Sequence, residues 1–199
     1  ECEVVCSTQP TTPTEITIPS LVEISEKDVS VTSIGDGAFS DCYNLTSIEI
    51  PNSVTSIGNL ALARTGLTSI VFPNGVTSIG THVINNCPNI ESVEIPSCLT
   101  EIGIHNFIAC PKLESIKVNA GNPVYDSRNN CNAVIETATN VLMAGCNNTI
   151  IPNTVTEIGD YAFHICSDLE SVTMSDNIRI IGSGAFSGCG EIKEFKGKC

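Results

Sequence analysis

The sequence predicts a solenoid, a fold in which short structural repeats stack into one elongated domain. An Ile-Gly pair recurs through the chain, with glycines at Gly35, Gly58, Gly80, Gly103, Gly159 and Gly182. The successive gaps are 23, 22, 23, 56 and 23 residues. The long gap fits one ordinary repeat plus about 33 inserted residues, and a fixed period of this length is the signature of stacked repeats.

Other positions follow the same period. The third and fourth residues after each glycine are small and large apolar residues in most copies: Ala38-Phe39, Ala61-Leu62, Val83-Ile84, Asn106-Phe107, Ala162-Phe163 and Ala185-Phe186. The seventh residue is small, at Cys42, Thr65, Cys87, Cys110, Cys166 and Cys189. A leucine or isoleucine then opens the next repeat, at Leu45, Leu67, Ile90, Leu113, Leu169 and Ile192.

Each element of one repeat has a physical reason. The pattern Leu45-x-x-Ile48-x-Ile50 predicts a short strand with one apolar side, which the following proline ends. Val54-x-x-Ile57 gives a second apolar edge, and Gly58 is expected to permit the turn after it. The Ala-Phe pair predicts a short helical or 3-10 turn whose ring fills the interior. A single copy cannot bury these faces, so copies must stack.

The full pattern, L-x-x-I-x-I-P-x-x-V-x-x-I-G-x-x-A-F-x-x-C-x-x, resembles the BspA-like (Treponema-type) leucine-rich repeats of bacterial surface proteins. The resemblance is carried by "LTSIEIPNSVTSIG" at 45–58, "AFSDC" at 38–42 and "AFSGC" at 185–189, and it covers 31 to about 195. The predicted fold is therefore a leucine-rich-repeat solenoid of the α/β class. We expect a right-handed, curved array of repeats with mostly short parallel strands.

The predicted domain organisation is an N-terminal cap at 1–30 and a repeat array at 31–199. An insertion at about 119–148 contains "CNAVIE", "TATN" and "VLMAGC", which predict a β-hairpin projecting from the array. Such insertions often mark a functional face, although a segment that only shields a core edge fits equally well. The last stretch, "EIKEFKGKC", begins a repeat without completing it, so we expect the natural protein to continue.

Composition restricts the partners. Asp and Glu outnumber Lys and Arg by 22 to 9, a formal net charge of −13. An acidic chain without a basic stripe is a poor partner for nucleic acid. The sequence has no apolar run long enough to span a bilayer. It begins at Glu1 without a Met, which we interpret as a processed or trimmed product, and the resemblance implies a secreted or cell-surface location.

The eleven cysteines divide by position. Those in the repeat pattern are expected to be small buried thiols. Cys131 and Cys146 flank the predicted hairpin and are disulfide candidates, with unpaired thiols an equal alternative. Cys2 with Cys6 is a weaker candidate pair. No C-x-x-C pair occurs, which gives zinc little support.

No catalytic or cofactor motif appears in the sequence. His82 and His105 both follow a repeat glycine by two residues and are expected to lie side by side on adjacent repeats. Two imidazoles without a third ligand fall short of a zinc site, so no metal is predicted. The sequence also has no nucleophile elbow and no H-E-x-x-H helix. We therefore predict no catalytic residues, no cofactor and no enzyme activity.

The residues between the apolar positions of L-x-x-I-x-I are expected to form columns on the exposed sheet face. One column is rich in Glu, the next in Ser, and a third contains Glu and Lys. Such a face favours a basic or hydroxyl-rich protein or glycoprotein, although exposed strands alone could also select these residues. The candidate ligand-binding residues are Ser47, Glu49, Glu91, Glu94, Glu114, Lys117 and Glu170.

Two functions remain open from the sequence. The resemblance implies adhesion, through a non-enzymatic binding module for host or extracellular-matrix partners. The alternative is a structural spacer that displays another domain of a longer protein.

Overall fold

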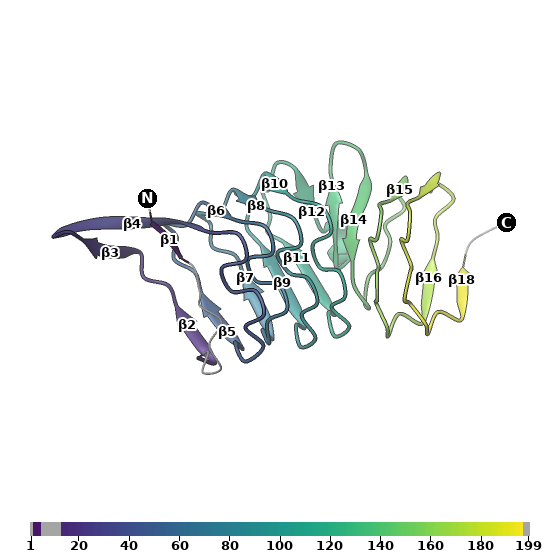
Figure 1. Cartoon of the computed structure of the whole chain (residues 1–199). Coiled ribbons are helices and arrows are strands. Elements are labelled where there is room, and N and C mark those ends of the chain that lie inside the picture. The colour runs from purple at the N-terminus through teal and green to yellow at the C-terminus, as the bar shows by residue number, and fades with distance from the viewer. Residues whose placement is uncertain (1, 5–12, 197–199) are drawn as a thin grey trace.

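The protein is an elongated stack of repeats (Figure 1). The structure, a computed structural model, describes residues 2–4 and 13–196. The predicted solenoid is confirmed, with repeats of about 23 residues that form parallel strands on two long sides. Most candidate binding residues lie on one of these sides, and the insertion joins the other.

The first long side, here the glycine-side sheet, carries the strands that precede the repeat glycines. Its first half pairs in the order β1-β4-β6-β8-β10, with β3 antiparallel to β4. These strands are β1 (Cys2–Val4), β3 (Leu21–Ile24), β4 (Lys27–Ile34), β6 (Ser56–Ile57), β8 (Ser78–Ile79) and β10 (Glu101–Ile102). Its second half pairs as β12 (Tyr125–Asp126), β13 (Ala133–Glu136), β14 (Val141–Gly145), β15 (Glu157–Ile158) and β17 (Ile180–Ile181).

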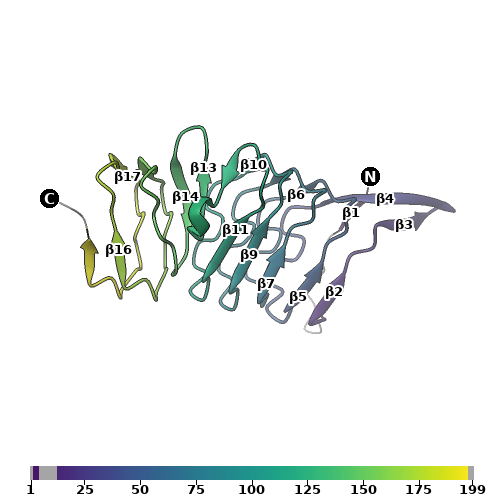
Figure 2. The same ribbon diagram turned by 180° about the vertical axis from the view of Figure 1, so that it is seen from behind.

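The second long side, the leucine-side sheet, faces the viewer when the molecule is turned around (Figure 2). It consists of three parallel groups, β2-β5, β7-β9-β11 and β16-β18. The strands are β2 (Glu15–Thr17), β5 (Ser47–Glu49), β7 (Ser69–Val71), β9 (Ser92–Ile95), β11 (Ser115–Val118), β16 (Ser171–Thr173) and β18 (Glu194–Lys196).

The expectation of helical or 3-10 turns after each glycine is wrong. In the described part of the chain, the only 3-10 helix is η1 (Arg128–Asn130), which belongs to the insertion. The repeat turns are β-turns whose backbone bonds alternate: Ala38 N–H donates back to Gly35, whereas Phe39 N–H donates to Ala61 of the next repeat. Half of the backbone N–H groups in each turn therefore donate to the neighbouring repeat, as those of a strand donate to the next strand. The turn side chains still fill the interior as expected, since Phe39 is buried.

The repeat glycines have a different role from the one expected. Gly58, Gly80 and Gly103 do not adopt left-handed conformations. They are required because the neighbouring repeat passes directly over them. A Cβ at Gly58 would lie 2.6 Å from the backbone nitrogen of Asp36, and one at Gly103 would lie 2.4 Å from the carbonyl carbon of Gly80.

The predicted hairpin forms as β13 and β14, which pair antiparallel. It lies within the sheet, however, and does not simply project from the array. β14 pairs parallel with β15, and Leu142 takes the place of a repeat isoleucine opposite Ile158. One strand of the insertion therefore replaces a missing strand of the glycine-side sheet.

The insertion also divides the interior. One hydrophobic cluster fills the repeats from Ile18 to Val118 and reaches Cys146, and a second runs from Cys131 to Ala185. The N-terminal residues close the first cluster, with Ile18 buried and Ile16 packed against it. The assignment of 1–30 as a cap stays a prediction, and residues 1 and 5–12 of that range lie outside the described part.

Candidate functional site

The middle of the leucine-side sheet has the flat, in-register surface that the sequence predicts. Strands β7, β9 and β11 pair without a shift, which aligns Ser69, Ser92 and Ser115 in one row. The next outward row contains Val71, Glu94 and Lys117. Neighbouring parallel strands lie about 4.8 Å apart, so each row presents side chains at that spacing. Val71 adds an apolar side chain that is 61% exposed.

The predicted binding residues do not form one continuous group. Ser47 and Glu49 lie on β5, beside β2, where the hydroxyl of Thr17 donates to the Glu49 carboxylate at 3.3 Å. Glu170 precedes β16 on the far side of the insertion. Glu91 and Glu114 do lie together, because the Glu114 backbone N–H donates to the carbonyl of Glu91 at 3.0 Å.

Ion pairs reduce the negative charge of this face. The Lys117 ammonium lies 3.1 Å from the Glu94 carboxylate, and the Lys193 ammonium lies 3.5 Å from that of Glu170. Among the described residues, Glu91 and Glu114 form no ion pair. Exposed pairs contribute little stability, so their effect is mainly on the surface potential. The unpaired acidic charge of the central sheet is therefore concentrated at Glu91 and Glu114.

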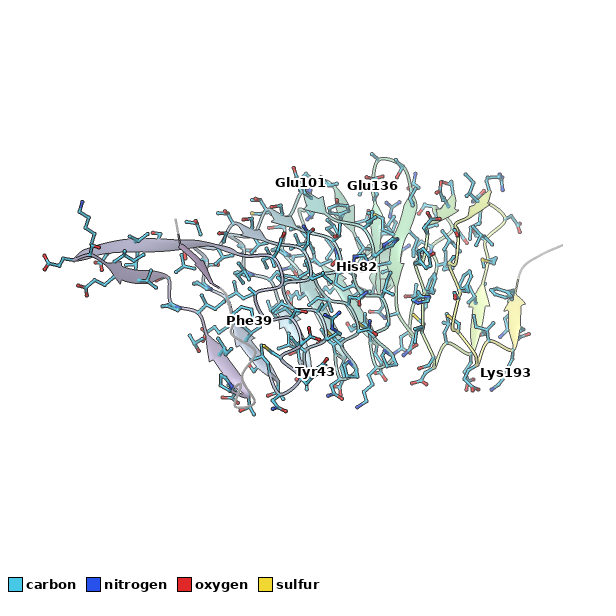
Figure 3. All side chains as sticks on the ribbon, in the orientation of Figure 1. Phe39, Tyr43, His82, Glu101, Glu136 and Lys193 are labelled. Atoms are coloured by element: carbon cyan, nitrogen blue, oxygen red, sulfur yellow. The ribbon has the colours of Figure 1, made fainter. Side chains whose placement is uncertain are left out.

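A ladder of aromatic rings crosses the turns between the two sheets, near the centre of Figure 3, where His82 is labelled. The expectation that His82 and His105 are neighbours is confirmed, with ring centroids 5.1 Å apart. The structure extends the ladder to two further rings, since Tyr161 lies 5.1 Å from His105 and His164 lies 5.5 Å from Tyr161. The sequence signal was available: Tyr161 occupies the same position after Gly159 as the two histidines do after their glycines.

His82 gives the protein a specific pH dependence. Partial burial, and then the charge of His105, lower the pKa of His82. The unfolded state, with a pKa of about 6.5, therefore binds the proton more readily. The lowered pKa of His82 in the folded state therefore contributes stability that is fully present above pH ~6.5. This contribution is lost as the pH falls below that value. We expect the fall in Tm from pH 7 to pH 5 to be smaller in His82→Gln, by on the order of 1 °C.

Thermal unfolding followed by circular dichroism measures this difference. His105→Gln serves as the matched control, because it removes the second cause and leaves His82 partly buried. The His105→Gln protein should retain part of the fall in Tm between pH 7 and pH 5 that the wild type shows. Equal losses in the wild type and in His82→Gln would contradict the assignment.

The disulfide considered between Cys131 and Cys146 is not formed, and both residues are buried thiols. Gly145 pairs with Ala133 across the hairpin, so the two cysteines do not face each other. Cys146 packs in the first hydrophobic cluster and Cys131 in the second. Burial raises the pKa of Cys131 to about 11, which keeps it protonated near neutral pH. The candidate partner of Cys2, Cys6, lies outside the described residues.

Cysteines of the repeat pattern, Cys42, Cys87, Cys110 and Cys166, are buried thiols as well. The pKa of Cys166 is raised well above its usual value, mainly by burial. Within the described ranges, no group of three or more His, Cys, Asp or Glu side chains is placed to hold a metal ion. The same part of the chain contains no helix with the length and apolarity that a membrane crossing requires.

The fold is shared with solved bacterial proteins. The pneumococcal vaccine antigen PcpA superposes with a TM-score of 0.67 at 16% identity, over 98% of this chain and 62% of the antigen. A leucine-rich repeat protein from Eubacterium ventriosum gives 0.62 at 22% identity, over 94% of this chain and 60% of its own. The chain therefore spans about three fifths of the length of these two structures.

A leucine-rich repeat protein from Treponema pallidum gives a TM-score of 0.55 at 25% identity, over 92% of this chain and 69% of its own. Among functionally curated proteins, no relative matches. The family described as "BspA type Leucine rich repeat region" matches in six copies over residues 14–133 and 141–198. The predicted resemblance is thus confirmed, and the chain belongs to the BspA-type leucine-rich-repeat family.

Proposed function

We propose that this chain is a non-enzymatic binding module of a secreted or cell-surface bacterial protein. In this proposal it mediates adhesion or protein–protein interaction through the leucine-side sheet. Family membership supports the surface context, and a solved neighbour from Faecalibacterium prausnitzii is itself named a leucine-rich cell surface protein. The observation that carries the proposal is the ordered, in-register surface of β7, β9 and β11.

That surface combines three features that suit a macromolecular partner. The serine row is small, which leaves room for close approach, while exposed Val71 offers apolar contact beside it. Glu91 and Glu114 supply unpaired negative charge at one margin. The expected partner is a protein or glycoprotein with a basic or hydroxyl-rich patch, because charge complementarity sets both the rate and the specificity of association.

The test uses two double variants that change net charge equally. Glu91→Gln/Glu114→Gln alters the proposed surface, whereas Glu101→Gln/Glu136→Gln alters the opposite edge, at the top of Figure 3. Binding to immobilised matrix glycoproteins and host cell-surface proteins would be measured by surface plasmon resonance. We expect the first variant to lose roughly tenfold in affinity and the second to bind as the wild type does.

The salt dependence provides a second readout. Binding that involves Glu91 and Glu114 should weaken with ionic strength in the wild type and much less in the first variant. Equal loss in both double variants would point to general electrostatic attraction and contradict the proposed surface. Saturable binding to none of the partners would favour the alternative, a structural spacer.

A further inference from the structure

The last repeat before the insertion meets the insertion at a junction that contains a cavity of about 250 Å³. Its walls are mostly apolar and come from β10 and its turn, the hairpin and the start of the next repeat. The main apolar contributors are Ile102, Ile104, Phe107, Val134, Val141 and Met143. The polar side chains of the lining belong to His105, Asn106 and Asp160.

A ladder of hydrogen bonds between the first repeats does not continue to this junction. In the first two repeats, the side chain of the residue after the glycine accepts a hydrogen bond from the equivalent backbone N–H of the next repeat. Asn59 N–H donates to Asp36 at 2.6 Å, and Thr81 N–H donates to Asn59 at 2.8 Å. Among the described residues, Ile104 N–H forms no such bond with Thr81, whose hydroxyl donates to Asn59 instead. The Ile104 side chain cannot accept a hydrogen bond, and the pattern resumes where Ser183 N–H donates to Asp160 at 2.6 Å.

The backbone at Gly159, which faces strand β14 of the insertion, is less closely covered than the backbone at Gly103. A Cβ added at Gly103 would lie 2.4 Å from the preceding repeat, whereas one added at Gly159 would find its nearest neighbour, the carbonyl oxygen of Leu142, at 3.1 Å. Ile104 is 62% exposed, although the repeat pattern places polar side chains at this position elsewhere. An exposed isoleucine beside an open apolar cavity indicates a surface suited to an apolar group.

The polar side chains of the lining determine which charge an occupant can carry. Asn106 is fully engaged, because its side chain accepts from Val83 N–H and donates to the carbonyls of Gly80 and Gly103. The Oδ1 atom of Asp160 accepts from Ser183, and its second carboxylate oxygen has no hydrogen-bond partner among the described residues. A positive group would therefore find an available carboxylate at the rim, within a chain of net charge −13.

We propose that this junction cavity binds an aromatic side chain of a partner polypeptide, with an adjacent basic residue held by Asp160. The volume suits the assignment, since an apolar cavity of about 150 Å³ already accommodates benzene. The aromatic ring enters between Ile104 and Met143, and the basic group remains at the solvent-exposed rim. The inference deepens the proposed binding function, on which it rests, by adding a second contact site away from the leucine-side sheet.

Methionine NMR can test the proposal directly, because the chain has only two methionines. Met143 lines the cavity, whereas Met174 packs against the second hydrophobic cluster and serves as an internal control. The probes are three capped tripeptides that differ in one charge: acetyl-Gly-Trp-Lys-amide, acetyl-Gly-Trp-Gly-amide and acetyl-Gly-Trp-Glu-amide. We expect saturable shifts of the ¹³C-methyl signal of Met143 alone, with the lysine peptide binding about threefold more tightly than the glycine peptide.

Three variants separate the contributions. Asp160→Asn should bind all three peptides alike, while Asp36→Asn, the equivalent substitution in a regular repeat, should retain the charge preference. Ile104→Thr, which introduces the residue type found at position 81, should weaken all three peptides by at least threefold. Denaturant unfolding of each variant would verify that the repeats remain folded.

Several results would overturn the proposal. These are no shift of Met143, equal shifts of both methionines, or a charge preference that survives Asp160→Asn. Free indole that binds as tightly as the lysine peptide would contradict a polypeptide partner and indicate a small-molecule site. The tripeptides do not span the leucine-side sheet, so failure here leaves the sheet proposal intact, and the reverse also holds.

Discussion

Gly103→Ala is expected to destabilise the protein by about 3 kcal/mol or more. The added methyl group would lie 2.4 Å from the carbonyl carbon of Gly80, 2.5 Å from its oxygen and 2.6 Å from the nitrogen of Thr81. These are backbone atoms that also bond to neighbouring repeats, so they cannot move aside as a flexible side chain would. Urea unfolding followed by circular dichroism measures the loss.

Two other glycines make this a graded series. Gly159→Ala, with its nearest contact at 3.1 Å, should cost less, and Gly190→Ala, with no atom within 4 Å, should be close to neutral. None of these three glycines adopts a left-handed conformation, so the comparison isolates steric contact from backbone preference. A Gly103→Ala protein as stable as Gly190→Ala would refute the role assigned to the repeat glycines.

Phe163→Ala is expected to cost about 3–5 kcal/mol, the range for removing a fully buried aromatic ring. Phe163 is 1% exposed, and its ring stacks on Phe186 with centroids 5.0 Å apart. It also covers Gly145 so closely that a Cβ there would lie 2.2 Å from the Phe163 ring. The side chain therefore joins the hairpin to the repeat that follows it.

The matched control is Phe186→Ala, which removes the same ring from a partly buried position of the next repeat. It should cost less than half as much, because less of its surface leaves water on folding. Guanidinium unfolding of both variants, monitored by tyrosine fluorescence and by circular dichroism, provides the comparison. Similar losses in the free energy of unfolding for the two variants would contradict the prediction that Phe163 contributes more than its neighbour in the next repeat.

Much of the fold could be predicted because the repeat leaves the same physical signature many times. The strands of Ile48 and Ile57, the buried Phe39 and the neighbouring rings of His82 and His105 all follow from position within the period. Because the copies share one pattern, an ambiguous segment can be assigned from the equivalent positions of the other copies. The same periodicity placed the serine row and the Glu columns on one exposed face.

What could not be predicted depends on contacts between repeats. The turn after each glycine has helix-compatible residues, yet half of its N–H groups bond along the stack, and no local pattern reveals this. The glycines were assigned to turns because a close backbone approach from another repeat leaves no mark on neighbouring residues. Likewise, Cys131 and Cys146 lie symmetrically about a hairpin in the sequence, but the hairpin places them in different clusters.

The candidate sites also combine features that the sequence predicts with features that only the structure shows. Glu91 and Glu114 were predicted with five other residues, and only the structure shows that Glu94 and Glu170 are paired with lysines. The junction cavity was not predicted, because it requires Ile104 and Met143 to come together across an insertion. One signal was present in the sequence: Ile104 is apolar where the other repeats have Asp, Asn, Thr or Ser.

The division of the interior into two clusters has a consequence for folding cooperativity. In a linear array, stability is the sum of contributions from single repeats and from the couplings between neighbours. The coupling across the junction is expected to be weaker than the coupling between regular repeats, because the cavity removes dispersion contacts there. Unfolding that begins at the C-terminal end can stop at this boundary and leave the first cluster intact. When the array is pulled, such a boundary limits how far a local rupture spreads along it.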